Sequence, residues 1–432
     1  MKEARERILA MLDELEQEHG VLPRFAHNLQ GQTDRVLYSG PLYDHEELAA
    51  AIETFILGKW FASGDQVARF EREFCKVVNA RKAVMVNSGS SANLVMVGAL
   101  KAFFGWKEGD EVLVSVVGFP TTVAPIYQYR LKPVFVDIEW ETLNFDLDQL
   151  ARKISPRTRA VVLSPVLGNP PDIDQLQEIC QAHSLQLVLD GCDSLGSLWE
   201  GRELSEYAVA ASSSFYPAHH ITTGEGGMVS ANEEELIAAA RSIAWWGRDC
   251  YCVGTANLLP KGTCGRRFDR WLDEQDVVLD HKYVFTHMGY NLKPLDLQGA
   301  IGRVQLQKLG EIHRARRENK ARVAAIFNRY LPQLNVARQL PKADPSWFGV
   351  PFLCPDKLLK QTLVAHLEKH GVQTRNYFAG NLLMQPGYKF LGDWRDYPLA
   401  NRVLEEVFFV GCSPTFTEKS FEHLEKVVEQ FA

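Results

Sequence analysis

The sequence predicts an α/β protein built on a large, mostly parallel sheet with helices on both faces. From about residue 82 onward, short runs rich in Val, Ile and Leu alternate with helical patterns, and these runs are almost uninterrupted by polar residues. Strands of this kind are buried on both sides, as in a sheet covered by helices. With 432 residues, the chain is also long enough for a second, smaller domain.

The elements can be assigned in chain order. The first stretch, MKEARERILAMLDELEQEHG, predicts a charged amphipathic helix. The runs KAVMVNSG, DEVLVSVVGF, KPVFVDI, TRAVVLSPV, QLVLD, AVAASSSFY and GGMVSAN are predicted to supply the sheet, with helices at SSANLVMVGALKAFF, DIDQLQEICQAHS and EEELIAAARSIAWWG.

A long helix, roughly 296–330, is predicted to lead into the second domain, which holds WFGVPFLC and the helices DKLLKQTLVAHLEKHG and EKSFEHLEKVVEQF. We therefore expect an N-terminal helical segment over 1–54 and a large domain over 55–300. The linking helix and a small α/β domain are expected over 301–432.

The composition and charge of the chain limit the kinds of molecule that it is expected to bind. The chain has 47 Lys and Arg against 54 Asp and Glu, a net charge of −7, without a basic block that would favour nucleic acid or an anionic membrane. The first helix lacks the apolar core of a signal peptide, and no run of about 18 apolar residues occurs. We expect a cytoplasmic protein that binds small molecules or other proteins, with its eight cysteines reduced.

A first candidate site follows the first predicted strand of the sheet. In VNSGSSAN, the backbone N–H groups of Gly89 and Ser90 open a helix, and a helix N-terminus attracts anions such as phosphate. An ordinary N-capped helix fits this motif almost as well.

A second candidate, Asp190 in VLDGCDSLG, lies at the end of an apolar strand. A carboxylate at such an edge needs a charged or hydrogen-bonding partner, and a protonated pyridine nitrogen would serve. The alternative is a turn or helix-capping aspartate.

Two further residues complete a recognisable set. Phe119 in VVGFPTT offers a ring for stacking, and Ser214 in the predicted strand run AVAASSSFY offers a hydroxyl to the same phosphate. Together with the two candidates above, they describe a pyridoxal phosphate site.

TTGEGG and GYNLKPLDLQGAIG match one family closely. From about residue 55 to 432 the chain resembles the sugar aminotransferase and dehydratase family of the aspartate aminotransferase type I fold. The resemblance implies that fold and a pyridoxal or pyridoxamine phosphate cofactor.

The resemblance also exposes a substitution. In the family's aminotransferases, the lysine that anchors the cofactor covalently lies three residues before TTGEGG, and that position here is His219; no lysine occurs between Lys153 and Lys261. A neutral imidazole can accept a proton at physiological pH but cannot hold the cofactor covalently. We expect His219 to be the catalytic base, with the neighbouring His220 as the competing candidate. A packing histidine in an inactive enzyme is the alternative.

Four cysteines form a possible metal set. Cys192, Cys250, Cys252 and Cys264 are separated by 57, one and eleven residues, spacings that fit neither the ferredoxin nor the usual zinc patterns. The CDP-4-keto-6-deoxyglucose 3-dehydrases, a branch of the family, are similar in the His-for-Lys replacement, in SFYPAHHIT and in WGRDCYC. That resemblance implies a [2Fe–2S] cluster on these four cysteines, the fourth assigned from GTCGRRF. The remaining cysteines are expected to be structural: Cys75, Cys180, Cys354 and Cys412.

The resemblance implies a reaction as well. The substrate would be a nucleotide-linked 4-keto-6-deoxyhexose, foremost CDP-4-dehydro-6-deoxy-D-glucose, which would lose its C3 hydroxyl on the route to 3,6-dideoxyhexoses of surface polysaccharides such as lipopolysaccharide. Electrons would come from an NAD(P)H-dependent flavin and iron–sulfur reductase.

The family resemblance implies a homodimer, in which Asn291 of GYNLKP reaches the phosphate of the partner's cofactor; capping the next helix is its other interpretation. Arg375 lies in a segment that resembles one near the sugar nucleotide, so it is expected to meet an anionic group.

Three alternatives remain. A TDP-4-keto-2,6-dideoxyglucose 3-dehydratase would share the histidine and the cysteines. A catalytically silent homologue would bind cofactor or cluster without turnover. An ordinary aminotransferase would need a lysine that this stretch does not supply.

Overall fold

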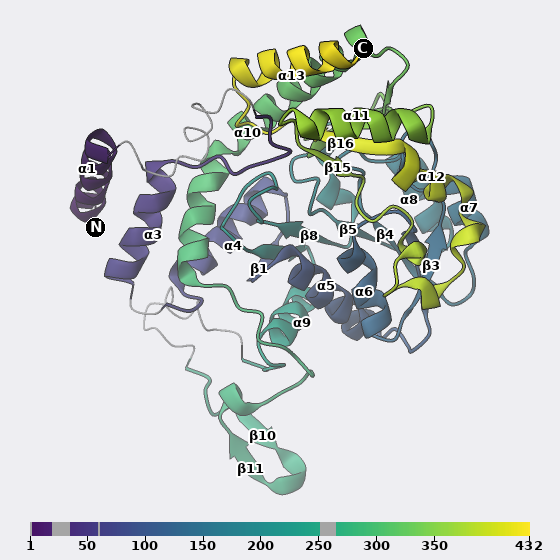
Figure 1. The fold of residues 1–432 in the computed structure, drawn as a ribbon. Helices are drawn as coiled ribbons and strands as arrows, with labels where there is room; N and C mark the ends of the chain where they lie inside the picture. Colours follow the sequence, from purple (N-terminus) through teal and green to yellow (C-terminus); the bar gives the residue numbers. More distant parts are fainter. Residues whose placement is uncertain (1, 20–34, 59–60, 251–264) are drawn as a thin grey trace.

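The predicted α/β fold is confirmed (Figure 1). The structure is a computed structural model, and it describes residues 2–19, 35–58, 61–250 and 265–432. The large sheet has seven strands in the order β1-β9-β8-β5-β4-β2-β3, in which β9 pairs antiparallel with β1 and with β8, and each neighbouring pair from β8 to β3 is parallel. The strands are β1 (Lys82–Val86), β2 (Glu111–Ser115), β3 (Lys132–Val136), β4 (Thr158–Leu163), β5 (Gln186–Asp190), β8 (Ala210–Ser214) and β9 (Gly227–Ala231).

Helices cover both faces of this sheet. Since successive strand residues point to opposite faces, each strand contributes side chains to a core on either side. In β2, Val112 and Val114 pack into one core and Leu113 into another. The first core is shared with α5 (Gly89–Phe104), α6 (Pro120–Gln128) and α9 (Glu234–Ala244), and the second with α7 (Leu147–Arg152) and α8 (Ile173–Ala182). The near-continuous apolar runs of the sequence therefore reflect strands buried on both faces.

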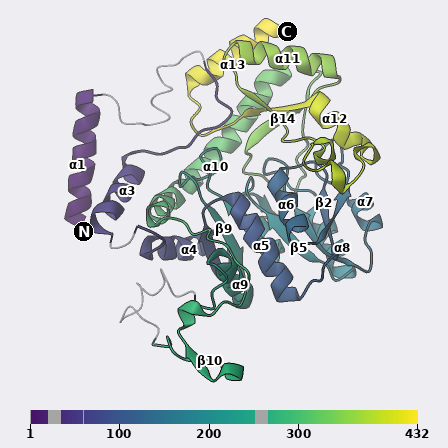
Figure 2. The same cartoon turned by 60° about the horizontal axis from the view of Figure 1, so that its bottom comes forward.

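The long helix α10 (Asp296–Tyr330) connects the large sheet with a smaller one, and it crosses the molecule diagonally in Figure 2. The small sheet is antiparallel in the order β12-β14-β16-β15, from Asn335–Val336, Gly349–Leu353, Val407–Gly411 and Thr374–Asn376. Helices α11 (Lys357–Lys369), α12 (Pro398–Glu406) and α13 (Glu418–Phe431) belong to the same part of the chain. Two short strands, β6 (Leu198–Trp199) and β7 (Arg202–Glu203), pair with β13 (Ala343–Asp344).

The N-terminal part is only partly helical. Helix α1 (Lys2–His19) packs on α3 (His45–Leu57), where the His45 ring lies 2.6 Å from Asp13 Oδ1 and 2.8 Å from Glu16 Oε2. Residues 35–44, in contrast, are extended and run beside the small sheet, because Val36 bridges Val372. The predicted domain limits at 54/55 and 300/301 fall inside α3 and α10.

Two further elements complete the described chain. Helix α4 (Asp65–Val77) packs against α10 and β1, and the hairpin of β10 (Arg270–Leu272) and β11 (Val277–Leu279) projects from the body in Figure 1. In the part of the chain that the structure describes, no helix combines the length and the apolarity needed to cross a bilayer.

Candidate active site

One cavity of about 710 Å³ lies where several strands of the large sheet end, facing the small sheet. This is the edge at which open α/β sheets bind ligands. The residues predicted from the sequence that line it are Gly89, Ser90, Phe119, Asp190, Cys192, Ser214, His219 and Arg375. The fold thus brings together predicted residues that are up to 286 positions apart in the chain, from Gly89 to Arg375.

The N-terminus of α5 forms one wall of the cavity. Ser88 caps this helix by accepting from the Ser91 N–H, so Gly89 and Ser90 occupy the first turn, whose N–H groups have no acceptor within the helix. A Cβ atom on Gly89 would lie 2.5 Å from Ser214 Cβ and 3.0 Å from Cys192 Sγ. The close approach of these two side chains therefore requires glycine, and it places the Ser214 hydroxyl beside a helix N-terminus suited to an anion.

Asp190 is a buried carboxylate whose described hydrogen-bond donors are all neutral. Its Oδ2 accepts from Thr122 Oγ1 at 2.6 Å and Asn93 Nδ2 at 2.8 Å, and its Oδ1 accepts from the Cys192 N–H at 3.3 Å and Ser212 Oγ at 3.4 Å. These contacts fix the carboxylate at the cavity wall without supplying a positive charge. A cationic N–H on a ligand would complete its environment.

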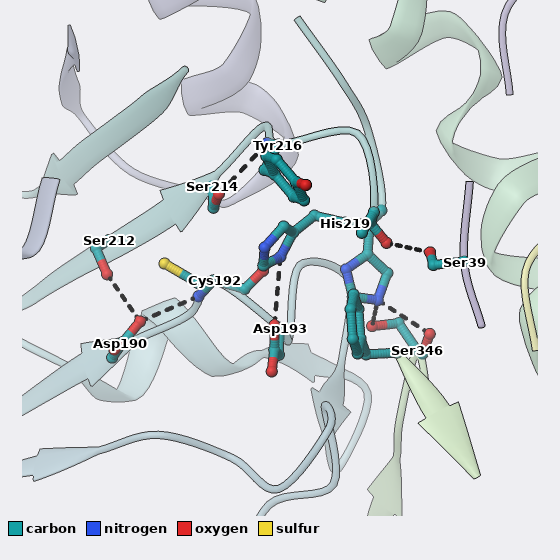
Figure 3. Close-up of polar contacts among 12 residues, drawn as sticks. Ser39, Asp190, Cys192, Asp193, Ser212, Ser214, Tyr216, His219 and Ser346 are labelled. Atoms are coloured by element: carbon teal, nitrogen blue, oxygen red, sulfur yellow. Dashed lines mark hydrogen bonds and ion pairs between the residues drawn. The ribbon is translucent and has the colours of Figure 1, made fainter. Parts of the chain in front are cut away.

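His219 lies between the Cys192–Asp193 turn and the ring of Tyr216 (Figure 3). Its Nδ1 is 2.6 Å from the carbonyl oxygen of Cys192 and 3.3 Å from Asp193 Oδ1. A carbonyl oxygen can only accept, so Nδ1 carries the proton. Burial lowers the pKa of His219 to about 4, and the charge of Arg316 acts in the same direction. The ring is therefore neutral at physiological pH, and its Nε2 is an unprotonated base.

The turn after β5 holds two groups whose charged forms are disfavoured. Burial, together with the charge of Asp190, raises the pKa of Asp193 to about 7. Burial and both neighbouring carboxylates raise the pKa of the Cys192 thiol well above its usual range. A cation bound at the sulfur would reverse that preference, since metal coordination favours the thiolate.

Aromatic side chains form much of the remaining wall. Phe119, at the start of α6, is 51% exposed, and its ring lies edge-on to Phe378 with centroids 6.0 Å apart. It therefore keeps free surface for stacking with a planar ligand. Phe348 lies 5.3 Å from the His219 ring, between ring centroids.

Sequence reasoning missed several lining residues that come from distant segments, notably Tyr38, Phe348 and Asn376. Tyr38 lies in the extended N-terminal segment, and its ring is 4.0 Å from the guanidinium carbon of Arg375. Asn376 Oδ1 accepts a hydrogen bond from Lys360 Nζ at 2.8 Å. No strand-end motif marks Tyr38 or Phe348, so the sequence carried no local signal for these two, whereas Asn376 directly follows Arg375 in the segment whose resemblance could have indicated it.

Outside the cysteine set, two predicted residues do not line the cavity. His220 is buried, and its Nε2 lies 2.9 Å from Ser346 Oγ and 3.0 Å from the Ser346 carbonyl oxygen. Asn291 is exposed and bridges Trp245 near the first turn of α5, where the Asn87 N–H donates to the Leu292 carbonyl. Its expected contact is with a second subunit and remains a prediction.

The predicted cluster ligands are only partly within the described chain. Cys192 lines the cavity, and Cys250 is buried at the end of the described stretch 61–250. Cys252 and Cys264 lie outside the described residues. The four cysteines expected to be structural carry free thiols, and all but Cys75 are buried.

The residues present fit a pyridoxal-type cofactor. The cavity volume falls within the range of about 300–1,000 Å³ that is usual for small-molecule sites. A phosphate would meet Gly89, Ser90 and Ser214, while a planar ring would meet Phe119 and a ring N–H would meet Asp190. No lysine is among the described residues that line the cavity.

Fold and site together define an enzyme of the pyridoxal-phosphate-dependent aminotransferase fold. Residues 42–432 match the DegT/DnrJ/EryC1/StrS aminotransferase family, and the chain belongs to it. The family predicted from the sequence is thereby confirmed.

The relatives include sugar 3-dehydratases. A dTDP-4-dehydro-2,6-dideoxy-D-glucose 3-dehydratase of Saccharopolyspora spinosa is 37% identical over 438 residues, covering 99% of this chain and 92% of that protein. The lipopolysaccharide biosynthesis protein RfbH of Salmonella typhimurium is 34% identical over 404 residues, covering 91% and 90%. Among solved structures, the E. coli GDP-4-keto-6-deoxy-D-mannose-3-dehydratase with bound hydrated PLP matches with a TM-score of 0.79 at 29% identity, covering 91% and 99%.

Proposed function

We propose that the protein is a pyridoxamine-phosphate-dependent 3-dehydratase of a nucleotide-linked 4-keto-6-deoxyhexose. The observation that carries this proposal is His219, which lines the cavity with Nδ1 bonded to the Cys192 carbonyl and with no hydrogen bond to Nε2 among the described residues. The family resemblance assigns this residue to the position of the cofactor lysine. A transaminase of this family needs a lysine there, whereas a dehydratase needs only a base.

Each of these parts of the cavity has a task in this proposal. Gly89, Ser90 and Ser214 hold the cofactor phosphate, Phe119 stacks on its ring, and Asp190 accepts a hydrogen bond from its ring N–H. When bound, pyridoxamine phosphate supplies an amine for the sugar's C4 ketone and a ring that can take up an electron pair.

His219 is proposed to accept a proton at Nε2 while the C3 hydroxyl of the sugar departs. Its hydrogen bond to the Cys192 carbonyl keeps the ring in the tautomer that can do so. An imidazole cannot replace lysine as a covalent anchor, so the protein does not retain the cofactor through a covalent bond. This favours loss of the hydroxyl over amine transfer.

The overall reaction that we propose also requires a reductant. Replacing the C3 hydroxyl by hydrogen consumes two electrons and two protons and releases one water. A [2Fe–2S] cluster on Cys192, Cys250, Cys252 and Cys264 would carry these electrons one at a time from an NAD(P)H-dependent flavin and iron–sulfur reductase. The position of Cys192 in the cavity wall supports this assignment, because it puts one ligand beside the cofactor site.

For the substrate, Arg375 is a suitable cation for the diphosphate of a nucleotide sugar, since it lines the cavity beside Tyr38. CDP-4-dehydro-6-deoxy-D-glucose is the first sugar to assay, as the sequence resemblance implies. The dTDP-linked 2,6-dideoxy sugar is the second candidate, favoured by the relative from Saccharopolyspora spinosa, which matches 99% of the chain. The exposed position of Asn291 supports a homodimer in which this residue reaches the partner's site.

The first experiment is an anaerobic absorption spectrum before and after dithionite, with iron and sulfide measured per chain. Visible bands that bleach, with about two irons per chain, would support the cluster, and Cys250→Ser should then lose them while Cys180→Ser keeps them. Iron-free protein, even after reconstitution, would overturn the electron-transfer step. Incubation with each nucleotide sugar and pyridoxamine phosphate then tests dehydration itself, and failure with both sugars would overturn the proposed function.

A further inference from the structure

Arg316 is a fully buried cation beneath the candidate active site. It lies on α10, is 0% exposed, and is not itself among the described residues that line the cavity. Burial of a guanidinium is costly unless its N–H groups are all satisfied or its charge is compensated. Its surroundings therefore indicate a specific task.

Arg316 donates four hydrogen bonds to backbone carbonyls, in two adjacent pairs, and its side chain also meets the thiol of Cys412. Its Nε has no hydrogen-bond partner among the described residues. One terminal nitrogen donates to the His219 carbonyl at 3.0 Å and the Ala218 carbonyl at 3.4 Å. The other donates to the Phe348 carbonyl at 3.2 Å and the Trp347 carbonyl at 3.4 Å. One planar guanidinium thus joins the loop that carries His219 to the segment that carries Phe348.

Both joined segments supply the cavity wall, where the ring centroids of His219 and Phe348 are 5.3 Å apart. The loop is held from a second side by Ser39, whose hydroxyl donates to the Ala218 carbonyl at 2.5 Å (Figure 3). The backbone of His219 is fixed by Arg316, and its ring is fixed separately by the Cys192 carbonyl at 2.6 Å. The ring can reach the Cys192 carbonyl only if the backbone is correctly placed.

We propose that Arg316 is a positioning residue that holds the His219 loop against the 347–348 segment. This keeps the His219 Nδ1–H bonded to the Cys192 carbonyl and leaves Nε2 as the proton acceptor. The role in the reaction rests on the function proposed above. The forked geometry of arginine is essential, because the compact ammonium group of lysine cannot donate along two parallel directions to two pairs of carbonyls.

The neighbours of Arg316 give no simpler account of its charge. Asp193 acts on it electrostatically, and the Cys412 thiol acts on it through both its charge and a hydrogen bond, but no carboxylate of the described chain is hydrogen-bonded to it. The nearby imidazoles of His220 and His313 cannot balance a positive charge. Arg316 therefore does not form an ordinary structural ion pair.

The test compares Arg316→Lys and Arg316→Met with the adjacent Arg317→Lys. Arg317 pairs with Asp344 at 2.9 Å and lies outside the cavity, so it is the matched control. Thermal melting identifies folded variants, and if Arg316→Met does not fold, Arg316→Lys decides. The first readout is the histidine side-chain ¹⁵N NMR spectrum, in which His219→Gln assigns the His219 signal and the chemical shifts report which nitrogen bears the proton.

We expect wild type and Arg317→Lys to show His219 protonated at Nδ1, and Arg316→Lys to lose that single tautomer. The second readout is turnover of the nucleotide sugar: Arg316→Lys should lose at least about tenfold in kcat with KM changed less than about threefold, and Arg317→Lys should keep wild-type values. An unchanged His219 signal, or unchanged turnover, in Arg316→Lys overturns the proposal. If the wild-type protein turns over neither sugar, the proposed function fails, and the NMR readout alone still decides whether Arg316 positions His219.

Discussion

The Nδ1–H group of His219 donates to the backbone carbonyl of Cys192 at 2.6 Å. The proposed base, His219, is thereby bonded to the main chain of Cys192 and not to its sulfur, which is the proposed cluster ligand. This hydrogen bond fixes the imidazole tautomer with a group that cannot itself be protonated, so the base keeps its free Nε2 whether or not the sulfur is coordinated.

Replacing His219 should impair dehydration but leave cofactor binding intact. His219→Asn removes the base, and we expect dehydration to fall by about 10²–10⁴-fold while the protein still binds pyridoxamine phosphate. The measurement is single-turnover loss of the C3 hydroxyl alongside equilibrium dialysis of the cofactor. An equal loss of cofactor binding would contradict the assignment of His219 as the base.

His219→Lys should restore the covalent anchor. The new amine would stand where the family's lysine stands, so borohydride reduction with pyridoxal phosphate should attach the cofactor to residue 219, as seen by mass spectrometry of peptides. Wild-type protein treated in the same way is the control and should remain unmodified at this position. Modification of another residue instead would place the cofactor elsewhere.

Asp190→Asn tests the partner of the cofactor ring. The change preserves shape but replaces an anionic acceptor by a neutral amide, and hydrogen bonds to charged groups contribute about 1.5–3 kcal/mol. We therefore expect cofactor affinity to fall by about 10–100-fold, measured by equilibrium dialysis. Asp356→Asn, at the N-cap of α11, is the control and should leave affinity unchanged.

Gly89→Ala tests the close approach at the anion site. The added Cβ would lie 2.5 Å from Ser214 Cβ, so the first turn of α5 must move and the phosphate contact should be lost. We expect at least about tenfold weaker binding of pyridoxal phosphate, which corresponds to about 1.4 kcal/mol.

Gly310→Ala is the control for that change. Gly310 lies within α10 with open space around it, and the substitution should stabilise the protein by up to about 1 kcal/mol without affecting binding. Wild-type affinity in Gly89→Ala would show that the cofactor phosphate does not bind at this turn.

Lys360 predicts a pH dependence of stability in the small domain. Burial lowers the pKa of Lys360 to about 8, whereas the unfolded chain has a lysine pKa of about 10.4. Between these values the unfolded state binds more protons, so the free energy of unfolding should rise with pH by up to about 1.4 kcal/mol per unit. The contribution of Lys360 to the free energy of unfolding is lowest below pH 8.

Urea unfolding of wild type and Lys360→Met between pH 7 and pH 10 measures this effect. The difference in free energy between the two proteins should shift in favour of wild type as pH rises. Lys357→Met is the control, since Lys357 is exposed and paired with Glu405. The difference in free energy of unfolding between this variant and wild type should not change with pH. A level difference for Lys360→Met would show that the amine is not held in its neutral form.

The sequence by itself determined the large sheet and one side of the cavity. Apolar runs separated by helical patterns specify a parallel sheet through local periodicity, and the residues after each strand necessarily gather at one edge. Gly89, Asp190 and Ser214 could therefore be placed in one site from their positions alone. The histidine at the lysine position was likewise a property of a single short segment.

Only the tertiary structure decided the rest. Tyr38 and Arg375 come together because the extended segment 35–44 runs beside the small sheet, and Arg316 meets the His219 loop because α10 crosses beneath it. The tautomer of His219 depends on a carbonyl 27 residues away in the chain. Such contacts depend on how helices and sheets pack against one another, and the periodicity of a single element carries no information about that packing.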